Sequence, residues 1–337
     1  MASLVTTNDN NDAPDAIVVE AILVKDTFYT FIDSCENHIL ALNSNGAVDH
    51  GRSNEFVVQY EPAPKTKYID ASAGNYASYL LRDDGVIVRA VNKGIHSEIV
   101  PPPKVKYTQM SSGQHASYFL REDGKVDRTT GGGKVELTMD SPPKARYTQV
   151  AAGHYRSFFL RDDGVVDYSV GKGKINGSIN CNDDSIKYVK MTKFSMGITT
   201  DKTDTNPNQI YFIRSDGAAD KYMITFGDQK NGLAGTVNCA MNGVKYVSGS
   251  TCQHATYLVR NDGAVDRITT GVKVGQTMNP PPSQKYINVC AGNHASYLLR
   301  SDGKIDRTKG SGLVSSTLDA PENVKKAGKT SDSCSIM

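Results

Sequence analysis

The chain has 337 residues, with 38 basic and 36 acidic side chains and a formal net charge of +2. This near balance argues against a general nucleic-acid binder, and no apolar stretch approaches the roughly 18 residues that a membrane-spanning helix needs. Hydrophobic residues make up 38%, enough to bury a core, and the polar start from Met1 to Ala16 has no signal-peptide core. We therefore expect a cytoplasmic protein whose six cysteines are reduced, since no Cys-x-x-Cys pair occurs.

A repeated pattern occupies almost the whole chain. Its two clearest copies begin at Tyr107 and Tyr286, and each has the glycine of an Asp-Gly pair 17 residues later. This glycine returns at spacings of 39, 39, 40, 53, 46 and 40 residues, at Gly46, Gly85, Gly124, Gly164, Gly217, Gly263 and Gly303. Because glycine adopts a positive φ without strain, it predicts a tight hairpin in each of seven copies.

Each copy predicts four short strands and shows no helical period. In the third copy the small-residue segment 108–111 is the expected innermost strand, and 115–121, 125–130 and 135–139 follow it. One such sheet would leave both of its faces exposed to solvent, whereas seven sheets packed around an axis bury these faces against one another. The predicted fold is all-β, a seven-bladed β-propeller of four-stranded antiparallel blades over residues 16–320, between polar tails 1–15 and 321–337. Residues Asp15–Val24 are a candidate for a further strand that closes the ring.

The motif Gly-x-His-(Ala/Ser)-(Ser/Tyr)…Leu-Arg-x-Asp-Gly-x-Val resembles the repeat of the regulator-of-chromosome-condensation propeller superfamily, over about residues 27–310. The copies are short and lack the family's usual Trp-Gly, and the chain has no tryptophan at all. That absence also disfavours WD-repeat and tectonin propellers and the light sensing of the plant UV-B photoreceptor. The resemblance implies a protein partner, with a small GTPase first to test and nucleotide exchange as the activity. None of the family's exchange residues can be matched to this chain.

Histidine returns at one repeat position in three copies, at His115, His254 and His294. Two other copies carry Tyr76 and Tyr155 there. One such residue per blade places the side chains on separate sheets around an axis. Hydrogen bonding within the scaffold therefore explains them better than a metal or catalytic site does.

No arrangement of residues predicts catalysis, a metal site or a cofactor. The chain has no Ser-His-Asp order, no Gly-x-Ser-x-Gly elbow and no His-Glu-x-x-His helix. The Asp-Asp-Gly turns lack the spacing of calcium ligands, and the Gly-Lys pairs lack the first glycine of a phosphate loop. An arginine and an aspartate flank each turn, as Arg121 and Asp127 do, and they are predicted to form cross-strand or inter-blade ion pairs. We expect a monomeric, non-enzymatic protein.

The connections between strands fall on two faces of the predicted ring. The Asp-Gly turns and the links between blades share one face, here called the turn face. A basic residue precedes the repeat tyrosine there in six copies, at Lys67, Lys106, Arg146, Lys187, Lys245 and Lys285. Mutual neutralisation with the acidic turns is the simplest explanation. The opposite face, here called the Gly/Lys face, has fewer acids and includes Lys134, Lys172, Lys174 and Lys273. It could hold an acidic protein surface or phosphates, or its loops could be ordinary solvated turns.

The fifth copy carries two insertions, both on the Gly/Lys face. About 12 extra residues lie around positions 199–208 and about six around 227–232. Partners usually bind where loops grow on one face of a rigid repeat scaffold, although tolerated surface insertions explain them equally well. The candidate partner-binding residues in these insertions are Asp201, Lys202, Asp204, Asn206, Asp228 and Lys230.

The chain ends in Cys334-Ser-Ile-Met337, which is a well-formed C-a-a-X box whose final methionine favours a farnesyl group. One lipid chain gives only reversible membrane attachment, so a second signal is normally needed. A modest basic cluster precedes the box, at Lys325, Lys326 and Lys329. We expect a cytoplasmic protein that becomes peripheral to membranes when Cys334 is prenylated.

These features together predict a regulatory protein-interaction module, tethered reversibly at membranes. Two alternatives come from other classes. A lectin-like propeller would bind one sugar per blade and would need a repeated polar and aromatic pocket. An inhibitor-type propeller would block a partner enzyme with one loop face. All three readings are non-enzymatic.

Overall fold

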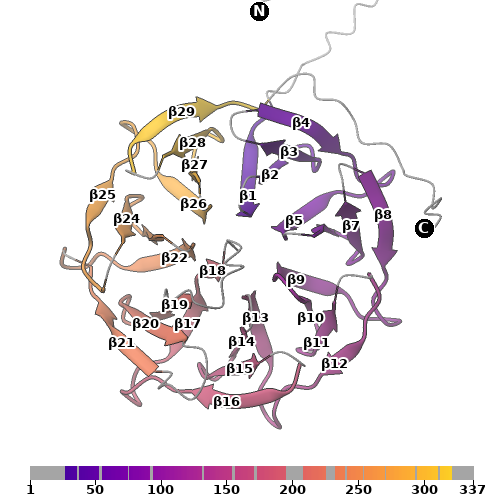
Figure 1. The fold of residues 1–337 in the computed structure, drawn as a ribbon, viewed down its shortest axis with the longest axis horizontal. Coiled ribbons are helices and arrows are strands. Elements are labelled where there is room, and N and C mark those ends of the chain that lie inside the picture. Colours follow the sequence, from indigo (N-terminus) through magenta and orange to yellow (C-terminus); the bar gives the residue numbers. More distant parts are fainter. Residues whose placement is uncertain are drawn as a thin grey trace, which may run out of the picture.

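The computed structural model describes residues 27–320, apart from 36–37, 53–54, 75, 92–93, 131–132, 154–155, 171–172, 195–207, 225–231, 240, 253, 270, 293 and 310–311. In this part of the chain all regular elements are strands, and they form seven sheets around an axis (Figure 1). Each blade has four antiparallel strands, so the protein is an all-β seven-bladed propeller, as the repeat predicted. No helix of the described residues is long and apolar enough to cross a membrane.

The blades follow one another along the chain. Blade 1 contains β1 (Tyr29–Cys35), β2 (His38–Asn43), β3 (Val48–Arg52) and β4 (Glu55–Tyr60). Blade 2 contains β5 (Tyr68–Ala73), β6 (Ser78–Arg82), β7 (Ile87–Val91) and β8 (Gly94–Ile99). Blade 3 contains β9 (Tyr107–Ser112), β10 (Ser117–Arg121), β11 (Val126–Thr129) and β12 (Leu137–Met139). Blade 4 contains β13 (Tyr147–Ala152), β14 (Arg156–Arg161), β15 (Val166–Val170) and β16 (Ile175–Ile179).

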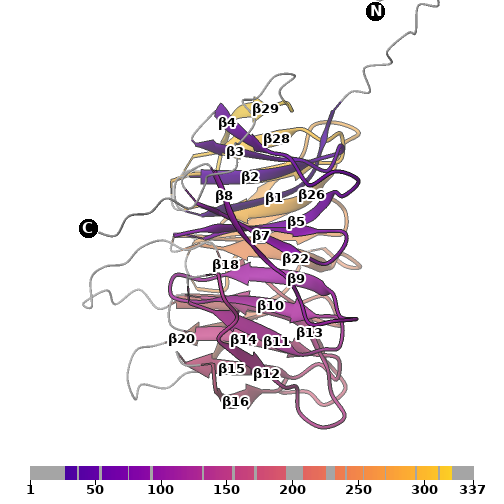
Figure 2. The same cartoon turned by 90° about the vertical axis from the view of Figure 1, so that its right-hand side faces the viewer.

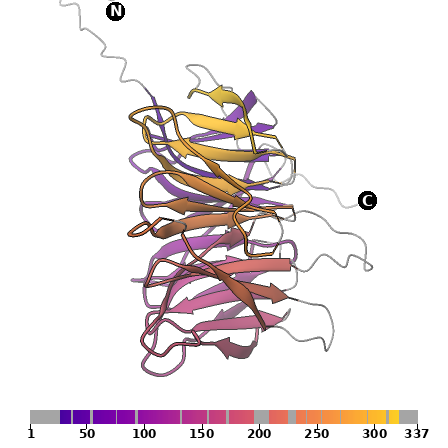
Figure 3. The same ribbon diagram turned by 90° about the vertical axis from the view of Figure 1, so that its left-hand side faces the viewer.

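Blade 5 contains β17 (Tyr188–Met191), β19 (Asn208–Arg214), β20 (Ala219–Ile224) and β21 (Gly232–Val237). Blade 6 contains β22 (Tyr246–Thr251), β23 (Thr256–Arg260), β24 (Val265–Ile268) and β25 (Gln276–Met278), and it is joined by the short β18 (Lys193–Phe194). Blade 7 contains β26 (Tyr286–Ala291), β27 (Ser296–Arg300), β28 (Ile305–Thr308) and β29 (Val314–Leu318). Figures 2 and 3 show that the strands run between two opposite faces, which separates the connections into two sets.

Hydrophobic side chains fill the space between neighbouring blades. There are seven core clusters among the described residues, and each joins two adjacent blades. Between blades 2 and 3, for example, Tyr79 and Leu81 of β6 pack with Met110 of β9 and Phe119 of β10. Both faces of every sheet are thus buried, which is the physical reason for a closed ring.

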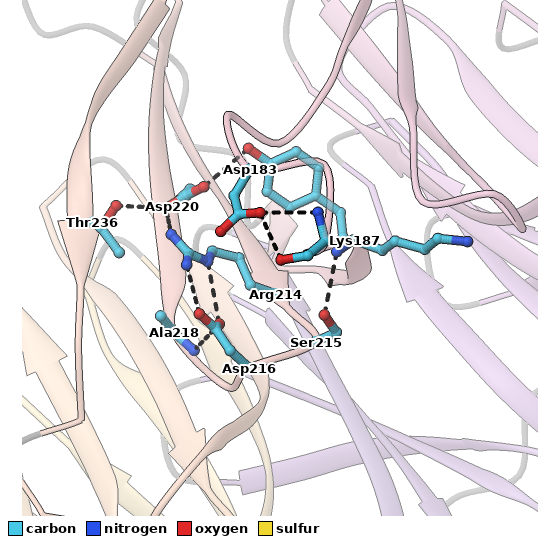
Figure 4. A network of polar contacts seen from close by, with 10 residues as sticks. Asp183, Lys187, Arg214, Ser215, Asp216, Ala218, Asp220 and Thr236 are labelled. Carbon is cyan, nitrogen blue, oxygen red and sulfur yellow. Dashed lines mark hydrogen bonds and ion pairs between the residues drawn. The ribbon is translucent and has the colours of Figure 1, made fainter.

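The repeat tyrosine and its aspartate hold each blade together. In blade 5 the Tyr188 hydroxyl donates a 3.0 Å hydrogen bond to Asp220, which also accepts one from Thr236 at 2.6 Å. Arg214 lies 3.4 Å from the Asp220 carboxylate and 2.5 Å from Asp216 in the turn (Figure 4). The expected arginine–aspartate ion pairs are confirmed as cross-strand contacts within one blade, with Arg121 3.8 Å from Asp127 and Arg300 3.6 Å from Asp306.

The turn glycine joins each blade to the next. Gly85 has a φ of 88°, and a Cβ atom added to it would lie 2.6 Å from Cβ and 2.9 Å from Cα of Lys106. The Tyr107 N–H donates to the Gly85 carbonyl at 3.3 Å. The basic residue before each tyrosine therefore packs over the preceding blade's turn. Charge adds a smaller effect, since the pKa of Asp84 is lowered mainly by its hydrogen bond from Arg82 and further by Lys106.

The same contact closes the ring between blade 7 and blade 1. Phe28 replaces the basic residue and packs on Gly303, whose carbonyl accepts a 3.0 Å hydrogen bond from the Tyr29 N–H. Each of the seven blades already has four strands between residues 29 and 318. The suggested closing strand at 15–24 lies outside the described residues, and the described ring is closed without it.

Candidate functional site

Polar side chains of the innermost strands link the blades around the axis. Side chains of one blade accept hydrogen bonds from backbone N–H groups of the next. Ser72 accepts from Ser112 at 2.9 Å, and Gln149 accepts from Met191 at 2.8 Å. Equivalent bonds reach Asp33 from Ala73, Ser111 from Ala152, Gln109 from Val150 and Ser250 from Ala291. This lining fixes the innermost strands, so groups attached to it are held rigidly.

Blade 5 interrupts this lining. After β17 the chain leaves its own blade and forms β18, which pairs in parallel with β22 of blade 6 and lies inside the ring of innermost strands (Figure 1). The Thr192 N–H donates to the Tyr211 carbonyl at 2.9 Å and so anchors the exit from blade 5. Phe194 stacks on Phe158 of blade 4, with ring centroids 6.1 Å apart.

Lys193 of β18 reaches the far side of the axis. Its Nζ lies 3.9 Å from the Asp70 carboxylate and 4.1 Å from the centroid of the Phe31 ring. Asp33, on the same strand as Phe31, is buried, and it and the partly exposed Asp70 both interact electrostatically with Lys193. We call Phe31, Asp33, Asp70 and Lys193 the axial cluster. Through β18, blades 1, 2, 4 and 6 all contact one short segment of blade 5.

Electrostatics explain why a lysine occupies this place. Burial raises the pKa of Asp33, and it raises that of Asp70 to about 6, while the Lys193 ammonium opposes both shifts. Partial desolvation lowers the pKa of the Lys190 ammonium group on β17, and the positive charge of Lys193 lowers it further. Without Lys193 the two carboxylates would lose the positive charge closest to them.

The axial cluster was not predicted, although the sequence contains a signal for it. Asp33 and Asp70 are the acidic residues of the innermost strands, and no other copy carries an acidic residue at either position. Aligning the seven copies position by position would have isolated both. Lys193 would stand out in the same alignment, since the equivalent position of the other copies holds serine, alanine or threonine. The alignment could not show that the chain leaves its blade there.

The structure places the described candidate residues on one face. Lys134, Lys174 and Lys273 are exposed in connections between third and fourth strands. Tyr76 and the three repeat histidines are also exposed, in connections between first and second strands nearer the axis. These histidines are His115, His254 and His294. Both kinds of connection belong to the Gly/Lys face, as expected. The histidines therefore form part of the surface and not of a packed interior.

The remaining candidates lie outside the described residues. This applies to Lys172, to Tyr155 and to the insertion residues Asp201, Lys202, Asp204, Asn206, Asp228 and Lys230. It also applies to the basic cluster and the lipidation site, Lys325, Lys326, Lys329 and Cys334. The ends of the insertions are described, and they join β18 to β19 and β20 to β21. Within the described ranges no group of three or more His, Cys, Asp or Glu side chains could hold a metal ion.

Comparison with known proteins supports the fold and not a family. No family model matches the chain, and no curated protein matches it. Solved structures do match: Prp20p from Saccharomyces cerevisiae has a TM-score of 0.53 at 13% identity, covering 77% of this chain and 80% of its own. BBS1N in complex with ARL6DN has a TM-score of 0.60 at 10% identity, covering 85% and 93%. A catalytically inactive virginiamycin B lyase from Staphylococcus aureus has a TM-score of 0.62 at 12% identity, covering 84% and 95%. At these identities the likeness is one of fold.

Proposed function

We propose that this protein is a non-enzymatic regulatory propeller, of the regulator-of-chromosome-condensation type, that binds a protein partner through its Gly/Lys face. One observation carries the proposal. The chain departs from its sevenfold pattern in blade 5, where β18 leaves the blade and two insertions join strands on this same face. A rigid ring that varies on one face is the usual arrangement of a binding scaffold.

The charge of the face favours an acidic partner. Lys134, Lys174 and Lys273 are exposed, and within the described part of the chain none of the three forms an ion pair. By contrast, on the turn face the aspartate that precedes the turn glycine is paired with an arginine of its own blade in six blades, as Asp163 is with Arg161. Uncompensated positive charge on one face steers an acidic surface toward it.

A small GTPase is the first partner to test, with nucleotide exchange as the sharper form of the proposal. The sequence resemblance supports this choice. Two of the similar structures are also named for protein partners, Gsp1p and histones for Prp20p and ARL6DN for BBS1N. Farnesylation of Cys334, aided by the basic cluster at Lys325, Lys326 and Lys329, would bring the propeller to a membrane where such a partner is concentrated.

Binding of the full-length protein to a panel of immobilised, nucleotide-free small GTPases tests the proposal. Charge reversal of Lys134, Lys174 and Lys273 to glutamate is expected to weaken binding at least about tenfold, since each rim charge mainly affects association. The matched control reverses three exposed lysines of the turn face, Lys65, Lys104 and Lys144, and should bind as wild type does. Equal losses in both variants would contradict the assignment of the face. Absence of binding to the whole panel would exclude the GTPase form of the proposal.

A further inference from the structure

We propose that Phe31, Asp33 and Asp70 form a binding site for a primary alkylammonium group, and that Lys193 fills this site in cis, so that β18 acts as a latch across the ring axis. The proposal concerns the axial cluster alone and stands whether or not the partner of the Gly/Lys face is a GTPase.

The contacts of Lys193 are those by which proteins bind an ammonium group. Its Nζ lies 4.1 Å from the centre of the Phe31 ring, within the range of a cation–π interaction. It lies 3.9 Å from the Asp70 carboxylate, and the buried Asp33 interacts with it electrostatically. An aromatic face combined with two carboxylates, largely removed from water, binds a cation more strongly than an exposed pair does.

The site itself is built without Lys193. Asp33 accepts a 2.9 Å hydrogen bond from the Ala73 N–H, and Asp70 accepts one of 2.9 Å from the Ala71 N–H. Phe31 and Asp33 belong to β1 and Asp70 to β5, which are innermost strands of two complete blades. The site is therefore fixed by blades 1 and 2, while its occupant arrives from a different part of the chain.

The neighbours of Lys193 in the chain also hold it in place, because the buried Thr192 donates its N–H to the Tyr211 carbonyl and accepts a hydrogen bond from the Thr251 hydroxyl. β18 has two residues, paired with Ser250 and Thr251 of β22, and Phe194 is partly buried against the core between blades 4 and 5. Withdrawing Lys193 would leave every four-stranded blade intact, but it would leave two carboxylates without the nearest cation. Two other titratable groups lie nearby: Cys290 of β26 interacts electrostatically with Asp33 and Lys193, and Lys190 of β17 interacts with Lys193. An alkylammonium group from another molecule could then neutralise the carboxylates in place of Lys193, so the occupant of the site can be exchanged.

Chemical rescue tests the site. The variant Lys193→Ala of the full chain is expected to melt at least about 3 °C lower than wild type at neutral pH. Propylammonium chloride should restore much of this loss, because it supplies the missing alkyl chain and charge together. Sodium chloride and tetramethylammonium chloride at equal ionic strength should not. Wild type should show no gain, since Lys193 already fills its site. Rescue by all three salts, or equal shifts in wild type, would overturn the proposal.

Two further arms keep the test decisive. If alanine prevents folding, Lys193→Met keeps the aliphatic stem, and ammonium chloride replaces propylammonium as the probe. The double variant Lys193→Ala with Asp70→Asn should lose the rescue; a retained rescue would contradict the site. Nα-acetyl-lysinamide as an additional probe separates the sources of the ligand. Rescue by it supports a lysine borne on a peptide, whereas rescue by propylammonium alone supports a small free amine.

Discussion

The hydroxyl group of Tyr107 donates a 2.7 Å hydrogen bond to the carboxylate of Asp127, from the first strand of blade 3 to the third. Burial and the neighbouring carboxylate raise the pKa of Tyr107, so its hydroxyl remains a donor at every physiological pH. The same bond recurs in five further blades, as Tyr29–Asp49, Tyr147–Asp167, Tyr188–Asp220, Tyr246–Asp266 and Tyr286–Asp306. Blade 2 lacks this bond because Val88 takes the place of the aspartate. The Tyr68 hydroxyl instead donates a 3.4 Å hydrogen bond to the Glu61 carbonyl.

This difference between blades provides a controlled mutation. Tyr107→Phe removes the donor but leaves a buried carboxylate, so the free energy of unfolding should fall by about 1.5–3 kcal/mol. Tyr68→Phe removes the same atom where no carboxylate depends on it, and should cost less than about 1 kcal/mol. Urea unfolding of both variants measures the difference. Equal losses would show that the tyrosine acts by packing and not through its hydroxyl.

The turn glycines are expected to be needed for blade contact as well as for backbone conformation. In Gly85→Ala the new methyl group would meet the Lys106 backbone, and the φ of 88° would be strained as well. Gly243 has a similar φ of 78°, but a Cβ atom there meets nothing within 4 Å. We expect about 1–2 kcal/mol of destabilisation for Gly243→Ala from the backbone alone. Gly85→Ala should cost about 1–3 kcal/mol more, from overpacking. If the two variants lowered the melting temperature by similar amounts, the contact between blades would not contribute to the effect of Gly85→Ala.

Asp70 should make stability fall as the pH rises. Its pKa in the folded protein is about 6, above the usual 3.8, so the folded state binds the proton more tightly than the unfolded state does. The free energy of unfolding of wild type, relative to Asp70→Asn, should therefore decrease by about 2.4 kcal/mol between pH 4 and pH 7. Removing Lys193 should move this decrease to higher pH, because the ammonium holds the pKa of Asp70 down.

Asp84 supplies the control with the opposite sign. Its hydrogen bond from Arg82 lowers its pKa below 3.8, so its contribution is present above the unfolded pKa and is lost as the pH falls through the lower, folded value. Wild type relative to Asp84→Asn should thus lose stability toward acid. Denaturation followed across pH 3–7 distinguishes the two, and parallel curves for both variants would contradict the assignment of Asp70.

Membrane association is expected to depend on the last four residues. A fluorescently tagged protein with an intact C terminus should divide between membrane and cytosol, because one farnesyl chain binds only reversibly. Cys334→Ser should move it to the cytosol, and reversal of Lys325, Lys326 and Lys329 to glutamate should have a partial effect. An unchanged distribution of the serine variant would show that the terminal box is not used.

Much of the architecture could be predicted from the sequence because it depends on residues that are close together in the chain. A glycine with a positive φ must follow the second strand of each blade, and a tyrosine must begin the first, so the spacing of these residues gives the number of blades. The alternation of connections in an antiparallel sheet then assigns loops such as that of Lys134 to one face. The reason for the basic residue before each tyrosine was less visible, since Lys106 meets Gly85 only when two blades pack.

The sequence by itself determined the sevenfold ring and its two faces, because each depends on residues close together in the chain. Only the tertiary structure decided that Lys193 lies against Asp70 and Phe31. Those residues belong to blades on the opposite side of the ring, and closure of the ring brings their strands to a common axis. The short β18 breaks the repeat to reach them, and the burial of two carboxylates there gives it a physical reason to do so.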